Sequence, residues 1–160
     1  ILVLLLTHAA ERAQTRVICA IHNDDSILLY ASDVEPIAHD LFDRLSPEDV
    51  NDIPNLLPET PLFAMTFRYN AYRSLLMSPR RFGKRTPLWA QRLDGARLLR
   101  EASEEKNHPM LTETMHECLT RVFDAHAAGK VLMRLRAGKI EVRELDMKHP
   151  SPFSLNMRRA

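Results

Sequence analysis

The residue types most able to do chemistry are gathered in one stretch, residues 66–92. It holds seven cations and no Asp or Glu: Arg68, Arg73, Arg80, Arg81, Lys84, Arg85 and Arg92. Aromatic rings are interleaved with them: Phe67, Tyr69, Tyr72, Phe82 and Trp89, the only Trp of the chain. Cationic side chains hold phosphates, and rings stack on bases. This stretch, here called the basic segment, therefore predicts contact with a nucleic acid.

The charge of the chain is sorted by region. Residues 1–60 contain eleven acids and three bases, residues 61–100 one acid and nine bases, and residues 101–160 nine acids and ten bases. The net charges of the three regions are −8, +8 and +1, although the net charge of the whole chain is only +1. A merely solubilising surface gives no reason for such sorting. The alternatives are a solvated basic face over a core, or neutralisation of the basic segment by the acidic first third.

Other constellations give weaker signals. Glu113, His116 and Glu117 have a helical metal-site spacing, but that chemistry needs a second such helix, which the sequence lacks. A polar helix face or a structural hydrogen-bond cluster is therefore favoured over a metal. No serine has an adjacent base, and Cys118 falls on an apolar stripe where desolvation disfavours a thiolate. With four Gly and no phosphate-binding loop, we predict no catalytic residue, no metal and no cofactor in this chain.

Three further side chains allow two interpretations each. The amides of Asn70 and Gln91 sit in predicted helices, where they could bond either to buried backbone or to base edges. Burial in a structural network is slightly favoured for Asn70, and the two interpretations are balanced for Gln91. A lone Trp on an apolar stripe is more often core than a stacking platform, so Trp89 stays open.

The elements that must position these residues form an α+β, mostly α-helical single domain with a β-hairpin near the N-terminus and a strand near the C-terminus. Its parts are residues 1–59 (a helix, the hairpin and acidic helices), 60–138 (the helical basic and aromatic core region) and 139–160 (the strand and a tail). Apolar periodicity and caps predict helices over 1–15, 33–45, 61–77, 88–102 and 125–137, with a short helix restarted at Ser46-Pro47 and another begun at Asn107-His108-Pro109. Strands are predicted over 17–21, 27–30 and 140–147, and residues 78–85 are predicted to be a loop.

Asp33, Ser46, Thr60 and Thr86 are predicted N-caps, Asp124 ends one helix and can cap the next, and Gly138 is a predicted C-terminal glycine. Cys19 and Cys118 lie in different predicted elements, so we expect free thiols in a reducing, cytoplasmic compartment. Residues 1–6 are apolar but too short to span a bilayer and lack a signal-peptide pattern, so we expect no membrane partner. A chain that opens on core-type residues without Met is expected to be part of a longer polypeptide.

Motifs across residues 60–155 match a known family in order and spacing. They are Phe67-Arg68-Tyr69-Asn70-Ala71 with Arg73 and Leu75-Leu76, Pro87-Leu88-Trp89 with Gln91-Arg92-Leu93, His108-Pro109, Glu113-Thr114 with Glu117-Cys118-Leu119, Phe123-Asp124, Gly138, and Ser151-Pro152-Phe153. Here the chain resembles the DEAD/H-associated domain of the large helicase-related (Lhr) family, the segment that follows the motor and winged-helix domains. His116 and Asp94 depart from the pattern, since basic residues are expected there.

The resemblance implies a parent enzyme, an ATP-dependent superfamily-2 helicase that moves 3′ to 5′ on single-stranded DNA and unwinds duplexes, including RNA:DNA hybrids. ATP and Mg would belong to that parent, and the partners implied are single-stranded DNA or an RNA:DNA hybrid and the motor and winged-helix domains of the same chain. The expected nucleic-acid contacts are Arg68, Arg73, Arg80, Arg81, Lys84, Arg85, Trp89, Gln91 and Arg92, and the expected structural motif residues are Asn70, Glu113, Glu117 and Asp124. The rival hypotheses are a purely structural buttress that packs on the motor or winged helix, and, more weakly, a stand-alone enzyme acting on nucleic acid.

Overall fold

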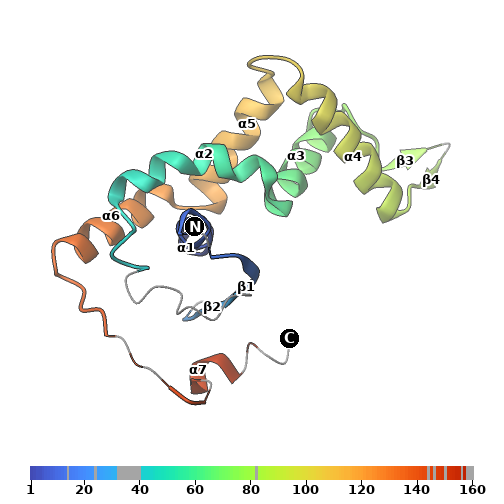
Figure 1. Cartoon of the computed structure of the whole chain (residues 1–160). Coiled ribbons are helices and arrows are strands. Elements are labelled where there is room, and N and C mark those ends of the chain that lie inside the picture. The colour runs from blue at the N-terminus through green and yellow to red at the C-terminus, as the bar shows by residue number, and fades with distance from the viewer. Residues whose placement is uncertain are drawn as a thin grey trace. The chain divides into compact units, whose positions relative to one another are not determined.

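The computed structural model describes residues 1–13, 15–23, 25–31, 41–81, 83–143, 145, 147–149, 151–155 and 157. The chain divides into two compact units, residues 1–53 with 125–160 (unit 1) and residues 54–124 (unit 2). Figure 1 shows their helices and short strands, and each unit is described by itself. The predicted α+β, mostly helical class is confirmed.

Unit 1 begins with helix α1 (Leu2–Arg12), which packs against strand β1 (Val17–His22) of an antiparallel hairpin with β2 (Ile27–Ala31). The hairpin turns at Asn23, whose side-chain oxygen accepts from the backbone N–H groups of Asp25 and Ser26. An Asn side chain stabilises a reversal in this way. The predicted hairpin is therefore confirmed, with a register irregularity between Val17 and Cys19.

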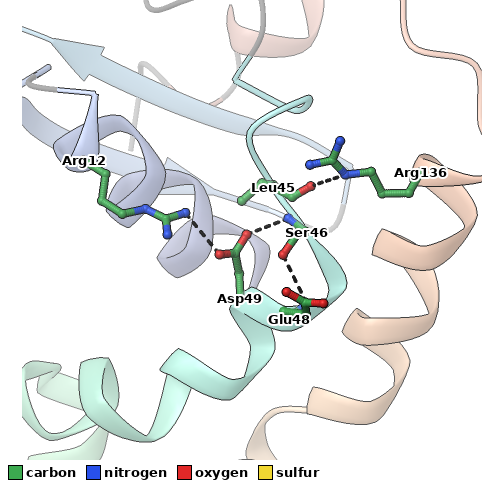
Figure 2. A network of polar contacts seen from close by, with 6 residues as sticks. All are labelled: Arg12, Leu45, Ser46, Glu48, Asp49 and Arg136. Carbon is green, nitrogen blue, oxygen red and sulfur yellow. Dashed lines mark hydrogen bonds and ion pairs between the residues drawn. The ribbon is translucent and has the colours of Figure 1, made fainter.

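The 3₁₀ helix η1 (Pro47–Asp52) starts at a complete capping box, as the Ser46-Pro47 signal predicts. Asp49 accepts from the Ser46 N–H at 2.6 Å and from the Arg12 guanidinium of α1 at 3.1 Å. From helix α6 (Ala125–Arg136), the Arg136 side chain donates to the Leu45 carbonyl at 3.0 Å. Figure 2 shows how these contacts join α1, η1 and α6 around one bend of the chain. Two arginines of unit 1 thus act as structural clamps.

In unit 2, short α2 (Ile53–Leu56, with its first residue in unit 1) and η2 (Leu57–Glu59) lead into α3 (Pro61–Arg73), which Thr60 caps by accepting from the Phe63 N–H. Phe63, Phe67 and Ala71 form its buried stripe. Helices α4 (Leu88–Ser103) and α5 (Pro109–Glu117) both pack against α3. A Cβ added at Gly95 of α4 would lie 3.2 Å from the stem of Arg68, so glycine allows a close approach of α3 and α4 there.

Helix α5 starts at His108, whose Nδ1 accepts from the Met110 N–H, and a π-helical turn η3 (Cys118–Val122) follows it. Helix α6 ends at Arg136 and is followed by a positive-φ glycine, Gly138, as predicted. The last helical segment among the described residues is α7 (Pro152–Leu155). None of the helices in the described part of the chain is long and apolar enough to cross a bilayer.

Four predictions about the elements need comment. Helix α3 ends at Arg73 rather than residue 77, because Leu75 adopts a positive φ of 63° that stops the helix. The predicted loop over 78–85 contains two short strands, β3 (Arg80–Arg81) and β4 (Lys84–Arg85). The predicted C-terminal strand is wrong, since no described residue from 139 to 149 lies in a strand. The predicted helix over 33–45 falls mostly outside the described residues, and residues 41–44 are a turn.

Candidate nucleic-acid interface

The basic segment lies wholly in unit 2 and runs along α3, through the β3–β4 hairpin, into the first turn of α4. Figure 1 shows the hairpin beside the beginning of α4. In the hairpin Arg80 lies opposite Arg85 and Arg81 opposite Lys84, with Gly83 turning the chain at a φ of 77°. The local fold therefore places four cationic residues on one two-stranded ribbon.

Three cations of this ribbon and one cation of α4 are open to an external anion. Arg80, Lys84 and Arg85 are exposed, as is Arg92 on α4. Among the residues that the structure describes, these four side chains make no ion pair, in contrast to Arg73.

A stripe on α4 combines a ring with this charge. Trp89 is 69% exposed and Leu93 is 64% exposed, so the interpretation of Trp89 as core is wrong. Arg92 and Ala96 are exposed as well, at the helical spacing that places all four side chains on one face. An exposed indole one turn from a free guanidinium is a surface on which a base could stack while its phosphate is held.

Arg68 and Arg73 on α3 differ from the cations of the hairpin. Arg68 is half-buried, with its aliphatic stem against Gly95. Arg73 lies 3.6 Å from the Glu117 carboxylate, although its side chain is 58% exposed. The basic segment has no acid within its own sequence, but the fold supplies one to Arg73 from the end of α5. Its availability to a phosphate is accordingly reduced.

Gln91 is the predicted contact that the structure moves away from the surface. It is 7% exposed. Its Nε2 donates to the Thr86 carbonyl at 2.6 Å, and its Oε1 accepts from the Tyr72 hydroxyl at 2.8 Å. With both ends of the amide engaged, Gln91 cannot also read a base edge in this conformation. The sequence predicts Thr86 as the N-cap of this helix and gives no sign that Thr86 and Tyr72 are the partners of Gln91. In the structure Pro87 takes the N-cap position, without a side-chain cap.

The predicted structural motif residues are not one cluster. Asn70 is buried and donates to the hydroxyl of the fully buried Thr114 at 3.2 Å, which ties α3 to α5. The Glu117 carboxylate forms an ion pair with the Arg73 guanidinium. Glu113 is exposed on α5, and Asp124 is exposed directly before α6. Thr114 is part of the family motif, but the sequence analysis gives it no structural role, since a hydroxyl next to a charged residue gives no signal of burial.

Cys118 is a buried side chain whose pKa the fold shifts. Burial raises the pKa of the Cys118 thiol, a hydrogen bond with Thr66 opposes that shift, and the charge of Glu117 adds to it. A thiol with a raised pKa is a poor nucleophile at neutral pH. No group of three or more His, Cys, Asp or Glu side chains within the described ranges could hold a metal ion.

Comparison with known proteins identifies the family. The family model described as DEAD/H associated matches residues 1–154. The chain is 42% identical over 96 residues to the Lhr helicase/uracil glycosylase of Escherichia coli strain K12, a match covering 60% of this chain and 6% of that protein. It is 32% identical over 141 residues to the Lhr helicase/probable uracil glycosylase of Mycolicibacterium smegmatis, covering 84% of this chain and 9% of that protein.

A solved structure gives the same result at the level of the fold. The structure of Mycobacterium smegmatis helicase Lhr bound to ssDNA and AMP-PNP matches with a TM-score of 0.84 and 28% identity, over 97% of this chain and 20% of that one. The chain thus spans a small part of the length of the relatives it matches. The resemblance expected from the sequence motifs is confirmed, and the chain belongs to the DEAD/H associated family, similar to a segment of the Lhr helicases.

Proposed function

We propose that the chain is an accessory nucleic-acid-contacting domain of an Lhr-type ATP-dependent helicase, holding a single strand behind the motor without reading its sequence. Similarity to segments of Lhr helicases, including one bound to ssDNA, supports the context. In this proposal the parent moves 3′ to 5′ on single-stranded DNA and unwinds duplexes, including RNA:DNA hybrids, and ATP and Mg act in its motor rather than in this chain. The nearest protein partners would be the motor and winged-helix domains.

The observation that carries the proposal is the union of free cations and an exposed indole in unit 2. Arg80, Lys84 and Arg85 form the ribbon, and Arg92 lies one turn beyond the exposed Trp89. Phosphates would lie along the cations, while one base stacks on Trp89. Every base offers a π-face to an aromatic ring, so such contact tolerates any sequence. Arg81 completes the ribbon by its place in the register.

Salt dependence of ssDNA binding by the full-length helicase tests this proposal. Each phosphate contact to a single strand contributes about 0.7 to the slope of log K against log salt. The triple variant Arg80→Ala, Lys84→Ala, Arg85→Ala should therefore bind more weakly and lose about 2 from the magnitude of the slope. A control triple variant, Lys130→Ala, Arg134→Ala, Lys139→Ala, removes the same charge from exposed positions of unit 1. Equal slopes for the two variants would refute a specific role of the ribbon.

The second candidate is a structural buttress, which exposed apolar side chains of unit 2 favour. Leu75 is 88% exposed beside an exposed Leu76, and Met65 is exposed on α3. Such side chains suit a protein surface better than a phosphate backbone. If this candidate is correct, the ribbon variant lowers the melting temperature of the helicase and leaves its strand affinity unchanged.

A further inference from the structure

The β3–β4 hairpin cannot be held in place by its own strands. Each strand has two residues, and a two-stranded ribbon of ordinary length is already marginal in water. Its cross-strand pairs are Arg80 with Arg85 and Arg81 with Lys84, so each pair places like charges opposite one another. Directly opposed like charges destabilise a strand pair. Contacts outside the ladder must therefore fix the hairpin.

The base of the hairpin supplies the first of these contacts. The Thr86 N–H donates to the Pro79 carbonyl at 2.9 Å, and the Ser78 hydroxyl donates to the Arg80 carbonyl at 2.8 Å. These bonds close the loop on itself. They do not connect the loop to a helix, so they leave its direction relative to α3 and α4 undetermined.

Gln91 makes that connection. Its amide nitrogen donates to the Thr86 carbonyl directly after β4, and its amide oxygen accepts from the Tyr72 hydroxyl on α3. The orientation of the amide follows from its partners, because a backbone carbonyl only accepts and must face the NH₂ group. Gln91 and Thr86 are both buried, at 7% and 8% exposure. A buried hydrogen bond in this setting is worth more than an exposed one, since water does not compete for it.

We propose that Gln91 is a positioning residue that fastens the basic hairpin to the α3–α4 pair, so that Arg80, Lys84 and Arg85 are presented as one fixed array. A neutral amide suits this place, because it bonds at both ends without adding to or cancelling the positive field. The role in binding rests on the proposed function, whereas the fastening itself does not.

Hydrogen exchange of the full-length helicase without nucleic acid tests the fastening. Gln91→Glu keeps an acceptor for Tyr72 but sets a carboxylate against the Thr86 carbonyl, and Gln91→Met removes both bonds at similar volume. Both variants should speed amide exchange over residues 80–86 by about three- to tenfold, the loss of one net hydrogen bond, while the middle of α3 and α4 is unchanged. Tyr72→Phe leaves the Gln91–Thr86 bond and should have a smaller effect. Tyr30→Phe, in β2 of unit 1, is the matched control.

Two results would overturn the inference: unchanged exchange over residues 80–86, or equal acceleration throughout α3 and α4, which would make Gln91 an ordinary interior residue. The salt slope of ssDNA binding then separates the inference from the proposed function. Faster hairpin exchange with a reduced slope supports both. Faster exchange with an unchanged slope supports the fastening and removes the hairpin from the strand path.

Discussion

Arg12 and Arg136 in unit 1 are used in the opposite way to Arg80 and Arg85 in unit 2. In unit 1, Arg12 binds the Asp49 carboxylate and Arg136 binds the Leu45 carbonyl, so both cations clamp the backbone around η1 (Figure 2). In unit 2, a neutral glutamine does the clamping, and Arg80 and Arg85 stay exposed without an ion pair among the described residues. The residue type alone therefore does not separate a structural arginine from a binding one; its partners do.

The largest effect that sharpens this comparison is expected from Asp49→Ala in unit 1. The variant removes the acceptor of the Ser46 N–H and the partner of Arg12, at a carboxylate that is itself buried. Loss of an N-terminal capping interaction and of a half-exposed ion pair costs about 2 kcal/mol of local stability. Hydrogen exchange of the η1 region should show it, with no change in ssDNA affinity.

Asp43→Ala, at an exposed aspartate of the same unit, is the control for Asp49 and should leave exchange unchanged. A fall in ssDNA affinity with Asp49→Ala would break the comparison, because unit 1 would then take part in binding.

A smaller effect is expected at Arg73, the member of the basic segment with a partner. Arg92→Ala should reduce the magnitude of the ssDNA salt slope by about 0.7, and Arg73→Ala should reduce it less, since Glu117 already holds that guanidinium at 3.6 Å. Because the Arg73 side chain is 58% exposed, its loss should cost at most about 1 kcal/mol of local stability. Matched salt titrations of the two variants decide this, and equal reductions would show that the ion pair does not restrain Arg73.

The smallest effect expected is a pH dependence of stability that comes from the buried Cys118 thiol, directly after α5. The folded state keeps the Cys118 thiol protonated, because burial raises its pKa above the ordinary value of 9.0. In the unfolded state the thiol loses this proton above pH 9.0. The contribution of Cys118 to the free energy of unfolding is therefore intact below pH 9.0 and is lost as the pH rises from there through the raised pKa. Hydrogen exchange of α5, corrected for intrinsic rates, should show the loss. Cys118→Ala should flatten it, and Cys19→Ala, at an exposed thiol, should not.

Local features of the fold could be predicted from the sequence. Ser46, Thr60 and Gly138 act through neighbours within four residues, and each takes the predicted role. The prediction of a C-terminal strand was wrong, because alternating apolar residues over 140–147 form a strand only where a partner strand pairs with them. None of the described residues there is in a strand.

At the candidate nucleic-acid interface, less of the structure could be predicted from the sequence. The apolar stripe that carries Trp89 favours the core over a stacking surface without deciding between them, whereas the structure leaves Trp89, Leu93 and Ala96 exposed on one face of α4. A helical period tells which side chains share a face, and only tertiary packing decides which face is covered. Tyr72 lies 19 residues from its partner Gln91, and Glu117 lies 44 residues from its partner Arg73. Only the fold brings these pairs together, so no local signal in the sequence reveals them.

Photo-cross-linking tests the central claim most directly. The full-length helicase is irradiated with single-stranded DNA that carries 5-iodouracil, a base that cross-links to aromatic side chains stacked on it, and the adducts are mapped by mass spectrometry. If a base stacks on Trp89, an adduct forms at Trp89, disappears in Trp89→Leu and weakens as salt rises. Adducts confined to other parts of the helicase, with the peptide containing Trp89 unmodified at low salt, would contradict it.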